Sequence, residues 1–323
     1  MTLLKVENLT VEFPSRRGTL TAIEDVCLTV APGEILGMVG ESGAGKSMTG
    51  AAIIGLIEPP GRIARGQILL NGSRIDNLGR EDMRRVRGRQ IGAIFQDPLT
   101  SLNPVLTVGE QLIETIQTHL KLSRSAARER AIDWLRRVGI PAPEKRVDTY
   151  PHQYSGGMRQ RVVIALALCA EPRLIIADEP TTALDVSVQA QIIALLRKLC
   201  KETGASVILV THDMGVIAET ADRVAVMYAG RVIEVGAVAD VLRAPRHPYT
   251  AGLMASIPRI GEKPDILPQI DGAMPRLNAR PEGCAFNPRC PKRMEVCARL
   301  RPDLVADAQG EVACHLFSKE LAT

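Results

Sequence analysis

The chain has few aromatic residues. Four Phe, four Tyr and one Trp make up 3% of its 323 residues, whereas hydrophobic residues of all kinds make up 46%. The core must therefore be built mainly from Val, Ile, Leu and Ala, a mixture that suits the buried faces of a parallel sheet. The length favours two domains, one large α/β domain and a small appendage.

The chain also lacks a large excess of positive or negative charge. The chain has 40 Lys and Arg against 36 Asp and Glu, so its net charge is +4. Its densest basic stretch, residues 79–90, holds five arginines and no aromatic residue. Because nucleic-acid surfaces commonly combine basic groups with stacking aromatics, a solvated or phosphate-facing surface explains this stretch better. We expect no nucleic-acid partner.

Long apolar runs are absent as well. The longest, residues 162–170, ends at Glu171 and Pro172 and falls well short of the roughly 20 residues that a membrane-spanning helix needs. Residues 1–8 carry charges where a signal peptide would have its apolar region. We expect the chain to be neither secreted nor membrane-spanning, so any membrane role must come through partners.

The residue pattern predicts an alternation of strands and helices. Residues 3–13 and 21–30 read as strands around a turn, and the apolar strand 34–39 precedes a glycine-rich turn and a helix at 47–56. The later pattern predicts helices over 107–138 and 188–203 and strands at 174–177, 206–210 and 223–235. This order favours a wound α/β sheet. The sequence becomes Pro-rich after about residue 256, so we place the domains at 1–257 and 258–323.

A phosphate-binding loop follows the strand at 34–39. Its fixed positions all match the P-loop pattern, and the residues are Gly40, Glu41, Ser42, Gly43, Ala44, Gly45, Lys46 and Ser47. Glycines let successive N–H groups and the helix N-terminus point at phosphate oxygens. Lys46 would reach the β- and γ-phosphates of a nucleotide, and the Ser47 hydroxyl would bind Mg²⁺. An ordinary glycine-rich turn is the alternative.

Two carboxylates end the apolar strand at 174–177. Asp178 can hold the magnesium shell, and Glu179 is the candidate base that orients and polarises the attacking water. Such pairs are common where strands run into loops, but the P-loop upstream favours a role in catalysis.

The segment 154–161, Tyr-Ser-Gly-Gly-Met-Arg-Gln-Arg, closely resembles the signature motif of ABC (ATP-binding cassette) proteins. Tyr and Met replace the usual Leu and Gln, but Ser155, Gly156 and Gly157 keep the core of the motif. A serine hydroxyl and glycine N–H groups at a helix start form an anion-binding terminus, although a capped helix start alone has the same pattern. The position about twenty residues before Asp178 matches the order in ABC proteins.

Other residues match this family in sequence order. Gln96 resembles the Q-loop glutamine, a further magnesium ligand that senses the γ-phosphate, and His212 resembles the switch histidine. Residues 183–185, Ala-Leu-Asp, resemble the D-loop and include Asp185. Phe13 is the candidate for stacking on adenine, and a core phenylalanine is its alternative.

The resemblance implies the fold and the partners. The expected fold is an α/β P-loop NTPase of the ABC cassette type, with a RecA-like core sheet, an antiparallel β subdomain and a helical subdomain over about residues 97–165. Two cassettes, identical or different, would close head-to-tail, so that Ser155 and Gly157 complete the partner's ATP site. Further partners would be two transmembrane permease subunits and an extracytoplasmic solute-binding protein. The chain would sit at the cytoplasmic face of the cell membrane.

Three segments resemble the oligopeptide and dipeptide branch of ABC importers. They are residues 95–104, residues 245–250 and the Pro-rich tail with Pro281-Glu-Gly-Cys284. This resemblance implies an ATPase that energises uptake of dipeptides, oligopeptides or related solutes. Nickel and other non-peptide importers share much of the core, and a soluble ABC ATPase, such as one for iron–sulfur assembly, is the alternative of a different class.

Four of the seven cysteines lie in the tail. Cys284, Cys290, Cys297 and Cys314 are separated by five, six and sixteen residues, without the Cys-x-x-Cys pairs typical of zinc knuckles. In the resembling importer branch, four similarly placed cysteines bind a [4Fe–4S] cluster, which thiolate ligation suits. Zinc, disulfides and free thiols are the alternatives. The remaining three cysteines are expected to pack in strands or helices.

Overall fold

The computed structural model describes residues 1–16, 18–182, 184–257 and 269–318. The chain forms two compact units, of which the first consists of Met1, Ala31–Ile35 and Asn77–Val210. The second consists of Thr2–Val30, Leu36–Asp76 and Thr211–Thr323. The predicted domain boundary at residues 257 and 258 falls at the edge of a stretch outside the described residues, and it stays a prediction.

Three parallel strands lie in the first unit. They are β6 (Ile91–Ile94), β7 (Leu174–Asp178) and β8 (Ser206–Val210), and β7 pairs with both of the others. Almost every residue of these strands is buried. Parallel strands are usually covered on both faces and are therefore rich in buried aliphatic residues. The buried parallel strands expected from the composition are thereby confirmed.

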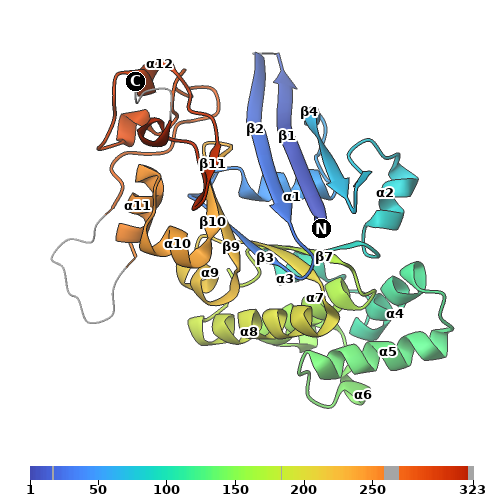
Figure 1. The fold of residues 1–323 in the computed structure, drawn as a ribbon. Helices are drawn as coiled ribbons and strands as arrows, with labels where there is room; N and C mark the ends of the chain where they lie inside the picture. Colours follow the sequence, from blue (N-terminus) through green and yellow to red (C-terminus); the bar gives the residue numbers. More distant parts are fainter. Residues whose placement is uncertain (17, 183, 258–268, 319–323) are drawn as a thin grey trace. The chain divides into compact units, whose positions relative to one another are not determined.

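Helices make up most of the rest of the first unit. In chain order these are α2 (Arg80–Val86), α3 (Pro98–Ser101), α4 (Val108–His119), α5 (Arg124–Arg137), α6 (Pro143–Arg146), η1 (Pro151–Gln153), α7 (Gly156–Leu168) and α8 (Val186–Thr203). Helices α4 and α5 lie side by side, and each also contacts α7 (Figure 1). The predicted helical subdomain over about 97–165 stays a prediction as a subdomain, although α3 to α6 and most of α7 fall within it.

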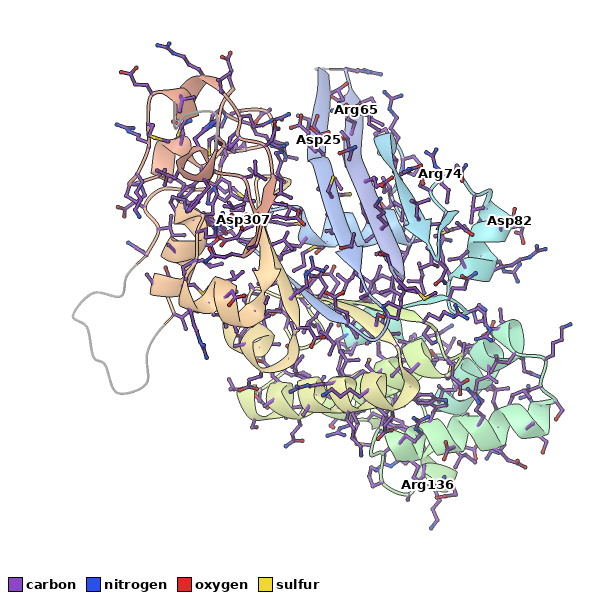
Figure 2. The ribbon with its side chains drawn as sticks, viewed as in Figure 1. Asp25, Arg65, Arg74, Asp82, Arg136 and Asp307 are labelled. Atoms are coloured by element: carbon purple, nitrogen blue, oxygen red, sulfur yellow. The ribbon has the colours of Figure 1, made fainter. Side chains whose placement is uncertain are left out.

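The second unit contains a four-stranded antiparallel sheet. Its order is β2 (Gly18–Val30), β1 (Leu4–Ser15), β4 (Arg62–Leu70) and β5 (Ser73–Arg74). Arg65 of β4 and Asp25 of β2 reach across β1 to form an ion pair of 3.7 Å (Figure 2). This sheet matches the antiparallel β subdomain that the resemblance implies.

Five further strands of the second unit are neighbours of one another. Their order is β3 (Ile35–Val39), β9 (Arg223–Tyr228), β10 (Arg231–Ala237), β12 (Gly310–Val312) and β11 (Val305–Asp307). Strand β3 is parallel to β9, and the other pairs are antiparallel. The tail thus adds two strands that its weak periodicity does not predict.

Short helices complete the second unit. They are α1 (Lys46–Ile53), α9 (Met214–Thr220), α10 (Val238–Arg243), α11 (Pro248–Ala255), η2 (Asn287–Arg289), α12 (Val296–Arg299) and η3 (His315–Phe317). None of the helices in the described part of the chain combines the length and apolarity needed to cross a bilayer.

Candidate active site

The predicted phosphate loop connects β3 to α1 in the second unit. Strand β3 is buried throughout, so the loop begins from a fixed point. Gly40 has a φ of 152° and Gly45 a φ of 106°, and a Cβ on Gly40 would lie 2.3 Å from the carbonyl oxygen of Met227. Only glycine fits such a backbone without strain. The predicted phosphate-binding residues 40–45 therefore lie on one tightly curled loop, and Lys46 and Ser47 begin helix α1.

Lys46 is held over this loop. Its Nζ donates to the carbonyl oxygens of Gly40, at 2.8 Å, and Glu41, at 3.2 Å, and the residue is only 5% exposed. Ser47, the next residue, is exposed. A buried ammonium at the start of a helix and an accessible hydroxyl are the groups that a phosphate and its magnesium ion require.

Two residues far along the chain bind Glu41. The backbone N–H of Glu41 donates to Tyr249 Oη at 2.9 Å, and Arg289 Nη1 donates to the two carboxylate oxygens of Glu41 at 3.0 and 3.1 Å. Sequence reasoning missed both contacts, because 208 and 248 residues separate the partners and no local pattern connects them.

Gln96 and Glu179 meet in the first unit. Strands β6 and β7 are parallel neighbours, so the residues that follow them emerge at the same edge of the sheet. Gln96 Nε2 donates to Glu179 Oε2 at 3.0 Å, and Thr182 Oγ1 donates to the same oxygen at 2.8 Å. The sequence motifs predict Gln96 and Glu179 each as a site residue, but not the hydrogen bond between them, and Thr182 was missed.

Glu179 also has an unusual backbone conformation. Its φ is 45°, in the left-handed region that non-glycine residues rarely adopt. Its N–H donates to the carbonyl of Val210 at 2.9 Å, which ties it to the end of β8. Strain of this kind is concentrated at functional sites. Asp178, the last residue of β7, is half-buried next to it.

The signature segment starts helix α7 of the first unit. Ser155 is the exposed N-cap residue, and its Oγ accepts the N–H of Met158 at 3.3 Å. Gly156 is also exposed, and a Cβ on Gly157 would lie 2.9 Å from Val188 Cγ1. Tyr154, which replaces the usual leucine, is buried and donates to the carbonyl of Arg146 at 2.6 Å. The segment thus presents an open helix N-terminus.

The D-loop and switch residues lie at helix starts. Asp185 is the exposed N-cap residue of α8 in the first unit, whereas Ala183 lies outside the described residues. His212 is exposed in the second unit, next to Asp213, which caps α9. The N–H of Asp213 also donates to Thr211 Oγ1 at 3.0 Å, which fixes the backbone around His212.

Phe13 lies on β1 and is half-buried. A Cβ on Gly61 would lie 2.6 Å from its ring, so the ring packs beside that glycine. Both readings of this residue, adenine stacking and core packing, fit a half-buried ring. Its role stays a prediction, as do the roles of the other site residues.

The four tail cysteines line one small cavity together with His247 and Phe286. Cys284, Cys290, Cys297 and Cys314 are all free thiols. Burial, and then the neighbouring thiols, raise the pKa of Cys284 to about 11. Among the described residues, no three His, Cys, Asp or Glu are placed to hold one metal ion. The structure places the four cysteines around one cavity.

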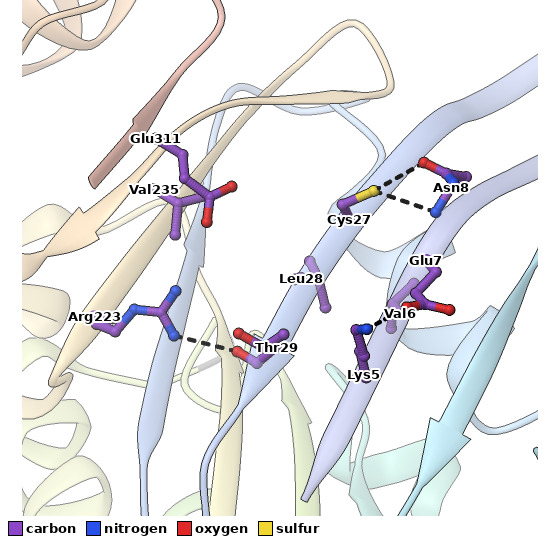
Figure 3. Close-up of a pocket in the computed structure, with 10 residues that line it drawn as sticks. All are labelled: Lys5, Val6, Glu7, Asn8, Cys27, Leu28, Thr29, Arg223, Val235 and Glu311. Atoms are coloured by element: carbon purple, nitrogen blue, oxygen red, sulfur yellow. Dashed lines mark hydrogen bonds and ion pairs between the residues drawn. The ribbon is translucent and has the colours of Figure 1, made fainter. Parts of the chain in front are cut away.

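Of the other three cysteines, Cys27 lies in β2, Cys200 lies in α8, and Cys169 is the C-cap residue of α7. Burial raises the pKa of Cys169 and of Cys200 to about 12 in each case. Cys27 lies on β2, where its thiol bonds to Asn8, and it lines a cavity of about 360 Å³ (Figure 3). That cavity, between Lys5 of β1 and Arg223 of β9, contains none of the predicted site residues.

Two family models match the sequence. The model described as "ABC transporter" matches residues 23–182, and "Oligopeptide/dipeptide transporter, C-terminal region" matches residues 233–297. The first match includes the phosphate loop, Gln96, the signature segment and the carboxylate pair. The second includes Tyr249, Arg289 and three of the four tail cysteines.

Curated relatives are similar over nearly the whole chain. A dipeptide transport ATP-binding protein, DppD, of Bacillus subtilis is 50% identical over 93% of this chain and 90% of its own length. DppD of Escherichia coli is 45% identical over 98% of this chain and 97% of its own. An oligopeptide transport ATP-binding protein, OppD, of Salmonella typhimurium is 47% identical over 99% and 95%.

Solved structures share the fold. A dimeric structure of the ATP-binding cassette MJ0796, bound to ADP and Pi in a post-hydrolysis state, is 30% identical with a TM-score of 0.65. It covers 73% of this chain and 98% of its own. The structure of cbiO1 from Clostridium perfringens, part of an ABC transporter complex, is 32% identical with the same TM-score, over 75% and 91%. The predicted α/β cassette fold is confirmed.

Proposed function

This chain belongs to the family of ABC transporter ATP-binding proteins that serve dipeptide and oligopeptide importers, and we propose that it energises uptake of dipeptides, oligopeptides or related peptide-like solutes. It is an ABC-type ATPase. The observation that supports ATP hydrolysis is the placement of Glu179 directly after β7. Its carboxylate accepts a hydrogen bond from Gln96 at 3.0 Å, and its backbone is strained. The relatives named for peptide transport support the cargo, because their similarity extends through the tail.

Glu179 would act as the base in ATP hydrolysis. Its carboxylate accepts hydrogen bonds and is half-exposed, so it can orient and polarise an attacking water. Gln96 would sense the γ-phosphate and, through its hydrogen bond, affect the Glu179 carboxylate. His212 would contact the same phosphate. Lys46 would hold the phosphates by charge, and N–H groups of the phosphate loop would bind them by hydrogen bonds, except that of Glu41, which donates to Tyr249 Oη.

Magnesium would accompany the nucleotide. Ser47 and Asp178, with Gln96, offer hydroxyl, carboxylate and amide oxygens, which are the ligands that this hard cation prefers. The exposure of Ser47 and partial exposure of Asp178 fit a role as ligands. When bound, magnesium neutralises negative charge on the phosphate oxygens.

The signature segment would serve a second cassette. Ser155, Gly156 and Gly157 form an open helix N-terminus, which attracts anions. In a head-to-tail dimer it would contact the γ-phosphate bound by the partner, and Asp185 would lie at the dimer interface. A dimeric cassette structure among the similar proteins supports this assembly. Two permease subunits and a solute-binding protein would complete the importer at the cytoplasmic face of the membrane.

The tail cysteines would bind a [4Fe–4S] cluster. Four thiols around one cavity match the ligand set of such a cluster. A bound cluster supplies cross-links between the segments that carry Cys284, Cys290, Cys297 and Cys314.

The transport function is tested with the assembled importer. We expect the chain to co-purify with two membrane subunits, and reconstituted vesicles to take up a labelled dipeptide only with ATP. Glu179→Gln should lower ATP turnover and uptake by at least about 100-fold, because general bases contribute on that scale. ATPase activity without associated membrane subunits would contradict the proposal and favour a soluble ABC ATPase, and uptake of nickel alone would contradict the peptide cargo.

The cluster is tested by anaerobic purification with iron, sulfide and zinc quantified. We expect iron and sulfide in equal amounts, about four of each per chain, from the [4Fe–4S] composition. Zinc, or no metal in a fully active protein, would overturn the cluster and leave the ATPase function intact.

A further inference from the structure

Arg289, in the tail, is fixed by hydrogen bonds on every side of its guanidinium group. Its Nε donates to the carbonyl of Asp271 at 2.8 Å, and Nη2 donates to the carbonyl of Ile270 at 3.2 Å. Nη1 donates to both oxygens of Glu41 and to Tyr228 Oη at 3.2 Å. The side chain is only 7% exposed. This arginine therefore has a defined position against the phosphate loop.

Aromatic rings support the same contact. Tyr228, Tyr249 and Phe286 pack with ring centroids 4.7 to 5.5 Å apart, and all three are buried. The guanidinium of Arg289 lies within 6.0 Å of the rings of Tyr228 and Phe286. Tyr249 Oη also accepts the backbone N–H of Glu41. Tyr249 thus binds the backbone of Glu41, and Arg289 binds its side chain.

The charge of Glu41 makes this contact important. A carboxylate in a phosphate-binding loop repels a polyphosphate, and the repulsion is strong where water is partly excluded. Burial lowers the pKa of Arg289, but its hydrogen bonds to Tyr228 and Glu41 outweigh this and raise the pKa overall, so it stays a cation. Paired with this cation, Glu41 adds no net charge to the loop.

We infer that Arg289 is a positioning residue for ATP binding, which holds the carboxylate of Glu41 away from the nucleotide and cancels its charge. The inference rests on the proposed role of residues 40–47 in binding phosphate. On this inference a residue of the C-terminal tail contributes to ATP binding, although the tail contains none of the ABC motifs.

The test measures binding of Mg·ATP and Mg·ADP to the full-length chain by calorimetry. Arg289→Gln should weaken ATP binding about tenfold, the size expected for loss of a charge-assisted hydrogen bond, and weaken ADP binding less. In the Glu41→Gln background the same substitution should have little effect, because no charge remains to be cancelled. Arg289→Lys should fall between, since it keeps the charge but loses the fork of donors.

The matched control is Arg301→Gln. Arg301 lies in the same tail and pairs with Glu24 at 2.7 Å, so its loss removes an equal charge without touching Glu41; we expect unchanged ATP binding. Equal weakening by Arg289→Gln in both backgrounds would overturn the inference, as would no weakening at all. Lys46→Ala separates the two proposals, because unchanged binding in that variant would refute the phosphate-loop role itself. Thermal unfolding of each variant shows whether it is folded, and Arg289→Lys provides the result if Arg289→Gln is not.

Discussion

Glu179 is oriented by its backbone as well as by its neighbours. A non-glycine residue in the left-handed region costs roughly 1–2 kcal/mol, and the N–H bond to Val210 helps to maintain it. Its Oε2 then accepts from Gln96 and from Thr182. Gln96 is the residue expected to respond to nucleotide. We therefore expect the Thr182 hydroxyl to keep its hydrogen bond to the Glu179 carboxylate whether or not nucleotide is bound.

Thr182→Val should therefore slow ATP hydrolysis. Loss of one neutral hydrogen bond, worth about 1 kcal/mol, predicts a roughly fivefold lower kcat with an unchanged KM for ATP. Thr182→Ser keeps the hydroxyl and should retain wild-type activity. Steady-state kinetics on the three proteins would decide, and a rise in KM with unchanged kcat would contradict this role.

Individual residues differ in how far the sequence predicts them. The motifs identify Lys46, Gln96 and Glu179, because each occupies a fixed place beside a strand or helix that the residue pattern also predicts. Thr182 and Arg289 occupy no such place. Their contacts with Glu179 and Glu41 arise only when the chain is folded, so a single sequence carries no signal for them.

Among the elements, helix α4 has a complete N-terminal cap. Thr107 Oγ1 accepts the N–H of Glu110 at 3.2 Å, and the Glu110 carboxylate accepts the N–H of Thr107 at 2.8 Å. This capping box satisfies two backbone donors that the helix leaves open. The carboxylate also gains from the N-terminal end of the helix dipole. Hydrogen bonds to Thr107 lower the pKa of Glu110 accordingly.

Thr107→Ala should destabilise this part of the protein by about 1 kcal/mol, the usual cost of losing a capping side chain. The measurement is the unfolding midpoint in urea, with Thr107→Ser as the variant that keeps the cap. Equal midpoints for wild type and Thr107→Ala would show that α4 does not depend on its cap.

Elements with strong local patterns were predicted well. Strand β3 and helix α8 are confirmed to within a few residues, because apolar runs and helical spacing are encoded locally. Strands β11 and β12 were missed. Each has only three residues, and they are strands because they pair in the order β11-β12-β10, not because of their own composition.

At the scale of the whole molecule, the tail shares the core of the second unit. Phe286 is 2% exposed and packs on Tyr228 and Tyr249, which lie on β9 and α11. Arg280 adds a hydrogen bond to the carbonyl of Ala22 on β2, at 2.9 Å. The extension predicted at residues 258–323 is thus joined to earlier segments by burial and by hydrogen bonds.

Phe286→Ala should therefore destabilise the second unit, and not only the tail, by about 3–5 kcal/mol. Leu300→Ala is the matched control, since this tail residue is 60% exposed and its loss should change stability by less than about 0.5 kcal/mol. Calorimetric unfolding would show the difference. A separate early transition confined to the tail in Phe286→Ala would mean that the tail folds independently.

The pairing of β12 with β10 has a consequence for the synthesis of the protein. Strand β10 ends at Ala237, but β12 begins only at Gly310. A ribosome must therefore translate the long segment between these two strands before β10 gains its last neighbours. Until then the nascent chain exposes the unpaired edge of β10, the kind of surface that chaperones shield from aggregation.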